Sequence, residues 1–274
     1  MEKLKKLMED IDMPAEAAAR VLAAELPFSA DQTEALSERL TDKDRYKEAA
    51  QELSAAEGFA QLRVFLCAAL KTRIRYAEKG IPDEIFVQTM KCFSRFVGEH
   101  RASCGEYGFD RGFWVGRQLS LLLFRLGELE YECADYEGEK ALSVHIPSDA
   151  DLTPEKLDRS FAAAREFFAK YGDGYAEAKF FCYSWLLAPA LGKLLPPTSK
   201  IALFQRRFKI VKTDEDSAGY IPWVFKKHDL KPEDFPENTT LQKNMKAFVL
   251  SGGKVGEALG VIAVSYTHLR AHET

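Results

Sequence analysis

The chain has 274 residues, enough for one large domain or two of ordinary size. Hydrophobic residues make up 46% and charged residues 29%, a composition typical of globular proteins that excludes a largely disordered chain. The formal net charge of -4 gives no support to a general nucleic-acid-binding or membrane-surface role, so we expect neither partner.

Residues 1–126 have a helical pattern throughout. The segment AEAAARVLAAEL consists of strong helix formers, and apolar residues from Phe59 to Leu70 recur as on one face of a helix. Gly80 and Pro82 mark the end of that helix and the start of the next, whose apolar face runs from Ile85 to Phe96. The sequence therefore predicts an all-helical domain whose apolar faces meet in a bundle core.

The periodicity changes after Gly127, where the chain becomes strand-like. In residues 128–133 glutamate alternates with apolar residues, and residues 142–146 alternate again, which predicts two half-buried strands. Glu137-Gly138 between them suits a two-residue hairpin turn.

The hairpin fixes a register. Glu130 then lies opposite His145, and Glu132 lies opposite Ser143. The apolar residues of both strands share the other face, against the core, and this agreement supports the register. They are Leu129, Tyr131, Val144 and Ile146.

Further elements alternate between helix and strand towards the C-terminus. Thr153 suits an N-cap and Pro154 the first turn of a helix. The predicted elements are this helix to Tyr171, a strand over Phe180–Leu187, a short helix over Pro189–Leu195, a strand over Phe204–Val211, a loop over 214–238, a helix from Leu241 to Val249 closed by Gly252-Gly253, and a strand over 260–264.

The five cysteines indicate a reducing compartment, because their number is odd and no CxxC pair occurs. The N-terminus lacks the apolar core of a signal peptide, and no segment is apolar for long enough to span a bilayer. We therefore expect a cytoplasmic protein.

The last eleven residues, VSYTHLRAHET (264–274), look like one translated frame of a sequencing-library adapter. An ordinary C-terminal tail is the alternative. We expect an artefact here and leave these residues out of the fold prediction.

Several longer strings are distinctive. They are GIPDEIF (80–86), YGFDRGFW (107–114), RQLSLLLFRLGELEYE (117–132), HIPSDADLTPEKLDRS (145–160), CYSWLLAP (182–189) and GGKVGEALG (252–260). These strings resemble a bacterial family of acyltransferase domain-containing proteins. Its members pair a helical N-acyltransferase N-terminal domain with a GNAT-like C-terminal domain.

The resemblance implies an α+β protein with the helical domain over residues 1–126 and the GNAT-like mixed α/β domain over 127–263. It also implies an acyl-CoA-dependent N-acyltransferase, with acyl-CoA as co-substrate and no metal. The acceptor would be an amine on a small molecule or peptide. The acyl chain and the acceptor stay unidentified.

One loop departs from the GNAT pattern. Standard GNAT enzymes have a Gly-rich Q/R-x-x-G-x-G/A segment whose main-chain N–H groups hold the CoA pyrophosphate. The corresponding residues 146–153 contain no glycine and two carboxylates, Asp149 and Asp151, which would repel that group. Either CoA binds differently or the site has decayed. The alternative function is therefore a non-catalytic binding module on a degenerate GNAT scaffold.

His145 is the leading candidate for a general base, with Glu130 opposite it to orient the imidazole. A half-exposed strand histidine with an incidental acidic neighbour is the alternative. The glutamates of the first strand could hold a cationic amine or could simply be solvated. On the third strand, which splays in GNAT enzymes to admit the thioester, Ser184 is a second catalytic candidate, while we interpret Cys182 as buried.

Candidates for acyl-CoA binding come from three places. Ser148, Asp149 and Thr153 lie in the loop that corresponds to the phosphate-binding segment. Arg206 belongs to a basic cluster that could receive the CoA 3′-phosphate, since guanidinium groups suit phosphate oxygens. Lys254 follows Gly252-Gly253.

The Asp149-x-Asp151 pair has two further interpretations. It could cap the following helix, which we favour, or bind a divalent cation as in a metal-assisted hydrolase.

Overall fold

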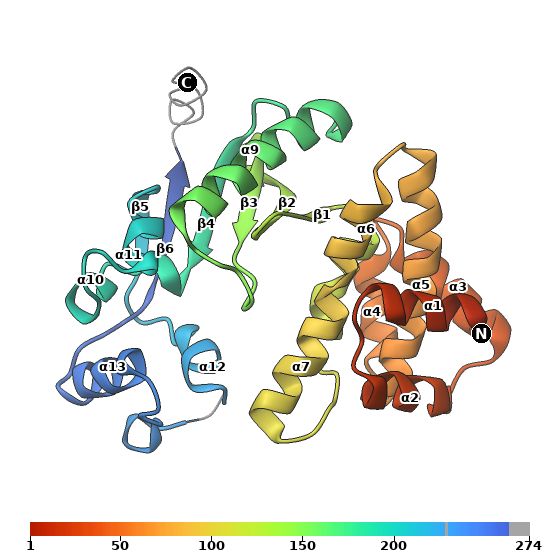
Figure 1. The fold of residues 1–274 in the computed structure, drawn as a ribbon, viewed down its shortest axis with the longest axis horizontal. Coiled ribbons are helices and arrows are strands. Elements are labelled where there is room, and N and C mark those ends of the chain that lie inside the picture. Colours follow the sequence, from red (N-terminus) through yellow and green to blue (C-terminus); the bar gives the residue numbers. More distant parts are fainter. Residues whose placement is uncertain (228–229, 263–274) are drawn as a thin grey trace. The chain divides into compact units, whose positions relative to one another are not determined.

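The computed structural model describes residues 1–227 and 230–262. Two compact units divide the chain: unit 1 is Met1–Leu126, and unit 2 begins at Gly127 (Figure 1). The tail over 264–274, and the last two residues of the strand expected over 260–264, lie outside the described residues.

Unit 1 is helical, as predicted, and ends in a short strand. Its elements are α1 (Glu2–Asp10), α2 (Ala15–Ala23), α3 (Ala30–Leu40), α4 (Tyr46–Leu53), α5 (Gly58–Glu78), α6 (Asp83–Met90), α7 (Cys92–Cys104), α8 (Gly112–Leu119) and β1 (Leu123–Leu126). Helix α5 is the centre of the unit, because α1, α2, α3, α6 and α8 all pack against it.

A capping side chain and a glycine account for the two ends of helix α5. The Glu57 side chain accepts hydrogen bonds from the N–H groups of Phe59 and Ala60 at its first turn. It ends before Gly80, which has a φ of +67° that glycine adopts readily. In the described ranges 1–227 and 230–262, no helix is both long and apolar enough to cross a membrane.

The helix expected from Ile85 to Phe96 is two helices. Helix α6 stops at Met90 and α7 starts at Cys92, with Lys91 at the break. The apolar face nevertheless continues across the break, since Phe86, Met90, Phe93 and Phe96 are all buried. A break at one residue leaves the spacing of buried positions nearly unchanged, so periodicity alone does not reveal it.

Unit 2 combines a mixed sheet with short helices. Its strands are β2 (Leu129–Tyr136), β3 (Glu139–His145), β4 (Lys179–Ser184), β5 (Lys209–Asp214) and β6 (Glu257–Ile262), in the order β2-β3-β4-β6-β5. Only the β3–β4 pair is parallel among those registers. The helices are α9 (Pro154–Tyr171), η1 (Trp185–Leu187), α10 (Leu191–Leu194), α11 (Lys200–Gln205), α12 (Tyr220–Phe225), η2 (Pro232–Asp234) and α13 (Thr240–Leu250).

The predicted β2–β3 hairpin is confirmed in its register. Glu130 pairs with His145 and Glu132 with Ser143. Glu137 and Gly138 have φ values of +56° and +80°, as the favoured two-residue hairpin turn requires.

Helix α9 covers one face of this sheet, as Figure 1 shows. The ring of Phe161 on α9 meets Tyr131 of β2 edge-on at 6.0 Å and Phe180 of β4 at 5.2 Å. Leu142, Val144 and Cys182 are buried on the same face. The other face carries the alternating polar residues, including His145 and Glu132.

Two predicted strands were wrong in part. The strand expected over Phe180–Leu187 ends at Ser184, and residues 185–187 form η1. The strand expected over Phe204–Val211 starts only at Lys209, because Ser199 caps α11, its hydroxyl accepting from the Ala202 N–H. Arg206 therefore lies at the end of a helix rather than on a strand.

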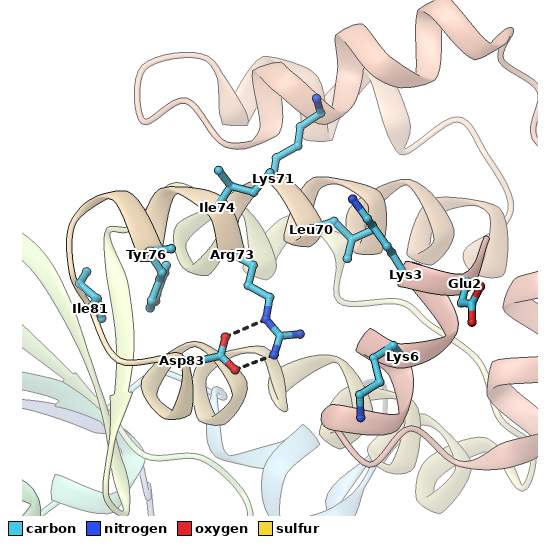
Figure 2. A pocket seen from close by; sticks show the side chains of 11 residues that line it. Glu2, Lys3, Lys6, Leu70, Lys71, Arg73, Ile74, Tyr76, Ile81 and Asp83 are labelled. Carbon is cyan, nitrogen blue, oxygen red and sulfur yellow. Dashed lines mark hydrogen bonds and ion pairs between the residues drawn. The ribbon is translucent and has the colours of Figure 1, made fainter.

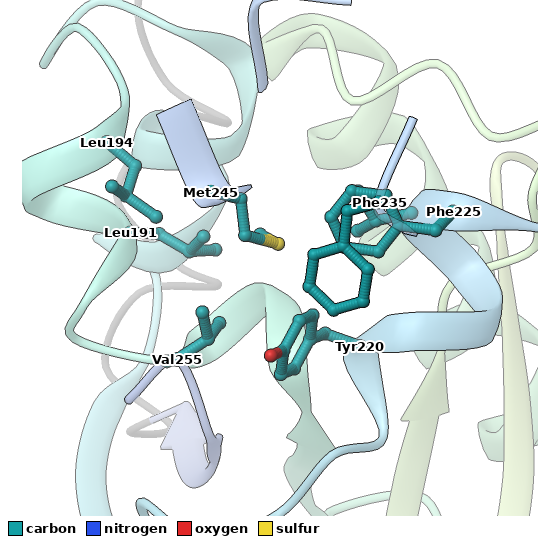
Figure 3. Close-up of a cluster of buried hydrophobic side chains, with 9 residues drawn as sticks. Leu191, Leu194, Tyr220, Phe225, Phe235, Met245 and Val255 are labelled. Carbon is teal, nitrogen blue, oxygen red and sulfur yellow. The ribbon is translucent and has the colours of Figure 1, made fainter. Parts of the chain in front are cut away.

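The segment 214–238, which we expected to be a loop, contains α12 and η2. Its aromatic residues pack into a second hydrophobic cluster, shown in Figure 3. Phe225 and Phe235 stack with ring centroids 3.9 Å apart, next to Tyr220. Met245 of α13 is buried in the same cluster. Charge and proline in the sequence suggested a loop, but a few large buried side chains are enough to order it.

Candidate active site

Strands β3 and β4 diverge at their C-terminal ends. Their parallel ladder consists of Ala141–Lys179, Leu142–Phe180 and Ser143–Phe181 and stops there. Strand β3 continues for two residues and β4 for three, and β4 stays paired with β6 as far as Ser184. Divergence of two parallel strands separates main-chain edges that would otherwise bond to each other, and an extended ligand can use such an edge.

His145 is the last residue of β3, at this divergence. Its Nε2 lies 2.7 Å from Oε2 of Glu132, and each side chain is 20% exposed. A carboxylate only accepts, so Nε2 carries the hydrogen, and a neutral imidazole then has its basic lone pair on Nδ1. This arrangement suits an oriented general base.

The carboxylate that contacts the imidazole belongs to a different glutamate from the one predicted. Glu130 lies directly opposite His145 in the register, as predicted, and is 2% exposed. The imidazole donates its hydrogen bond to Glu132, the diagonal neighbour. Long side chains reach diagonal positions across a strand pair, so the register alone does not decide between the two glutamates.

Ser184 lies on the other face of the sheet from His145. The register of Ser143 with Phe181 places His145 on the face of Tyr183, and alternation then places Ser184 with buried Cys182. The Ser184 hydroxyl accepts from the Leu186 N–H at 3.1 Å and so begins η1. The structure does not bring Ser184 and His145 together.

Cys182 is fully buried, as predicted. Burial raises the pKa of its thiol, which favours the protonated, unreactive form. It acts as a core residue.

The loop over residues 146–153 is bonded largely to acidic side chains of its own unit. The Asp151 N–H donates to Oε2 of Glu128 at 2.8 Å, and the Ala150 N–H donates to the Pro147 carbonyl. Thr153 is the N-cap residue of α9, as predicted, but its hydroxyl donates to Asp151 at 2.6 Å instead of capping the helix. Ser148 and Asp149 are exposed in the middle of the loop.

Two lysines compensate the charge of Asp151. Lys200 of α11 lies 2.6 Å from Oδ1, and Lys156 in the first turns of α9 lies 3.1 Å from Oδ2. Hydrogen bonds from Lys200, Thr153 and Lys156 hold the pKa of Asp151 well below its ordinary value. The repulsion expected between this loop and a pyrophosphate is therefore smaller than the bare sequence indicates.

The basic residues predicted to bind CoA bond to different parts of unit 2. The guanidinium of Arg206 donates to the Pro197 carbonyl at 2.8 Å, whereas neighbouring Arg207 pairs with Asp158 of α9 at 2.5 Å. Lys254 precedes β6 and pairs with Asp216 at 2.6 Å. Lys200 was not among the predicted site residues, because it meets the loop across 49 positions of the chain and no local pattern indicates such a contact.

The described part of the chain contains no group of three or more His, Cys, Asp or Glu side chains placed to hold a metal ion. The Asp149–Asp151 pair is thus not part of such a group. Asp151 is engaged with lysines and Thr153.

Comparison with known proteins gives consistent matches over both units. Residues 2–121 match the N-acyltransferase N-terminal domain family, and residues 123–262 match the GNAT-like C-terminal domain family. No curated protein matches the chain in sequence.

Solved structures of acyltransferases share the fold. One, in complex with decanoyl-CoA and teicoplanin, is 23% identical with a TM-score of 0.82. Another, with CoA and 10C-teicoplanin, is 22% identical with a TM-score of 0.83, and a third, with decanoyl-CoA, is 25% identical with a TM-score of 0.77. Each comparison covers 96% of this chain and 88% of the other.

Proposed function

The chain belongs to the acyltransferase family that pairs an N-acyltransferase N-terminal domain with a GNAT-like C-terminal domain, and from this premise we propose that it transfers an acyl group from an acyl-CoA to an amine. The observation that carries the proposal is the divergence of β3 and β4, with the His145–Glu132 pair at the end of β3. The complexes of the similar structures with CoA or decanoyl-CoA support the choice of donor.

The acceptor in our proposal is an amine on a peptide or small molecule. Two of the similar structures contain teicoplanin or a derivative of it, which supports a peptide-like acceptor. His145 takes a proton from the acceptor ammonium, and Glu132 positions the imidazole and stabilises its cation.

The chemical step needs little from the protein beyond placement. The amine nitrogen attacks the thioester carbonyl carbon, the C–N bond forms, the C–S bond breaks, and CoA leaves as a thiol after taking up a proton. A thioester is already activated, so holding the two reactants together supplies much of the acceleration. Main-chain N–H groups at the strand edge stabilise the developing oxyanion.

Phosphate binding is assigned to side chains in this proposal. Lys200 and Lys156 lie beside the loop that replaces the Gly-rich segment, and they would exchange Asp151 for the CoA pyrophosphate. Exposed Ser148 can donate a further hydrogen bond. Arg206 and Lys254 are assigned no contact, because they bond to Pro197 and Asp216, outside the loop over residues 146–153.

A non-catalytic binding module is the second candidate. It is favoured by the Asp151 N–H, which donates to Glu128 rather than facing a ligand, and by the absence of glycine from residues 146–153. A module of this kind binds CoA thioesters weakly or not at all and never consumes them.

Two measurements separate these candidates. The first is thermal unfolding with CoA thioesters from acetyl to dodecanoyl, since a ligand that binds only the folded state raises the midpoint. The second is mass spectrometry of amine acceptors after incubation with any thioester that raises it. Acylated product that His145→Ala abolishes supports the proposal. Stabilisation without product from any amine supports the module, and an active His145→Ala variant contradicts the assigned base.

A further inference from the structure

Unit 1 contains a pocket far in sequence from His145. It has a volume of about 740 Å³ and lies between α1, α5 and the start of α6 (Figure 2). That volume is within the range of small-molecule sites, about 300–1,000 Å³. Its apolar lining comes from Leu70, Ile74, Tyr76, Ala77 and Ile81. Tyr76 and Ile81 are buried.

Ile74 on the apolar wall is open to contact with a ligand, since it is 60% exposed. Four of the five apolar residues belong to helix α5, whose main-chain groups bond within the helix and offer little to a peptide backbone. A ligand with polar main-chain groups would lose hydration there without replacement bonds, whereas a hydrocarbon chain loses nothing.

Three of the four cationic side chains that line the pocket are held by carboxylates. These three are Lys6, Arg73 and Lys71. Arg73 is fixed in place by Asp83, with bonds of 2.7 and 2.6 Å, and by Asp10 at 2.7 Å. Lys6 shares Asp10 with Arg73.

Lys3 is the cation best placed for a ligand. The described residues provide no ion-pair partner for it, whereas Lys71 is held by Glu34 and Glu38. In Figure 2 its side chain extends from α1 towards Leu70 on α5. A carboxylate bound here would have its hydrocarbon chain against the apolar wall.

We propose that this pocket binds a single-chain fatty acid in its carboxylate form. The chain lies against Leu70, Ile74 and Ile81, and the carboxylate meets Lys3. This inference does not depend on acyl transfer and would hold for a protein without activity.

Isothermal titration of the full chain with decanoate tests the proposal. Each buried methylene contributes about 0.8 kcal/mol, so affinity should rise up to about fourfold per carbon from hexanoate to decanoate. Decyltrimethylammonium, with the same chain and opposite charge, should bind more weakly, by up to about fivefold. Equal binding of both probes, or no binding of decanoate, overturns the proposal.

Two exposed apolar helix residues give matched variants. Ile74→Glu places a carboxylate in the wall and should weaken decanoate binding more than tenfold, whereas Leu250→Glu on α13, 51% exposed, should leave it unchanged. Thermal unfolding of both variants shows that they fold. Unaltered binding by Ile74→Glu, or complete displacement of decanoate by CoA without an acyl chain, places the fatty acid elsewhere and refutes the assignment.

Discussion

Replacing Phe235 by alanine tests whether the second hydrophobic cluster holds residues 214–238 in place. Phe235 is 2% exposed and stacks on Phe225 at 3.9 Å. A buried phenylalanine removes about 200 Å² from water, worth about 5 kcal/mol at about 25 cal/mol per Å². Alanine keeps part of that burial, so we expect a loss of about 3–5 kcal/mol in the free energy of unfolding of unit 2.

Urea unfolding followed by circular dichroism measures this loss, with Leu250→Ala as the control. Leu250 is a large apolar residue of the same unit but is 51% exposed, so its change should stay within about 0.5 kcal/mol. A midpoint shift at constant slope would mean that the cluster unfolds together with the sheet. A loss below about 1 kcal/mol for Phe235→Ala would refute the anchoring role.

Three further predictions concern the site and the hairpin. Glu132→Gln should lower kcat/KM for acyl transfer about 10- to 100-fold, because a hydrogen bond to a charged group is worth about 1.5–3 kcal/mol; unchanged turnover would contradict the positioning role. The pKa of Asp151 is lowered, so this carboxylate stabilises the folded state fully above its ordinary pKa of 3.8 and loses that contribution as the pH falls further. Asp151→Asn should therefore flatten the decline of the free energy of unfolding with falling pH. Gly138→Ala should cost about 1 kcal/mol through its φ of +80°, while Gly192→Ala in helix α10, also without a close neighbour, should stabilise by about 0.4–1 kcal/mol; urea unfolding measures both.

The hairpin was predictable because its information is local. Two alternating segments and a turn dipeptide fix a register, and the register placed His145 on the polar face beside the acidic strand. The choice of Glu132 over Glu130 was not predictable, since it depends on the rotamers of long side chains.

Contacts between distant segments account for most of what the sequence did not reveal. Lys200 reaches Asp151, and Arg207 reaches Asp158, each across 49 positions. Similarly, residues 214–238 fold onto α13 through a few aromatic side chains in a polar segment, where average composition is a poor guide.

Strand β6 imposes an order on biosynthesis. It is the last strand described, yet it lies between β4 and β5, so these two have no common neighbour until Glu257–Ile262 has left the ribosome. Until then two strand edges of the nascent chain can capture foreign strands. A premature stop codon before Glu257 should therefore yield an aggregating polypeptide that depends on chaperones, not a smaller functional one.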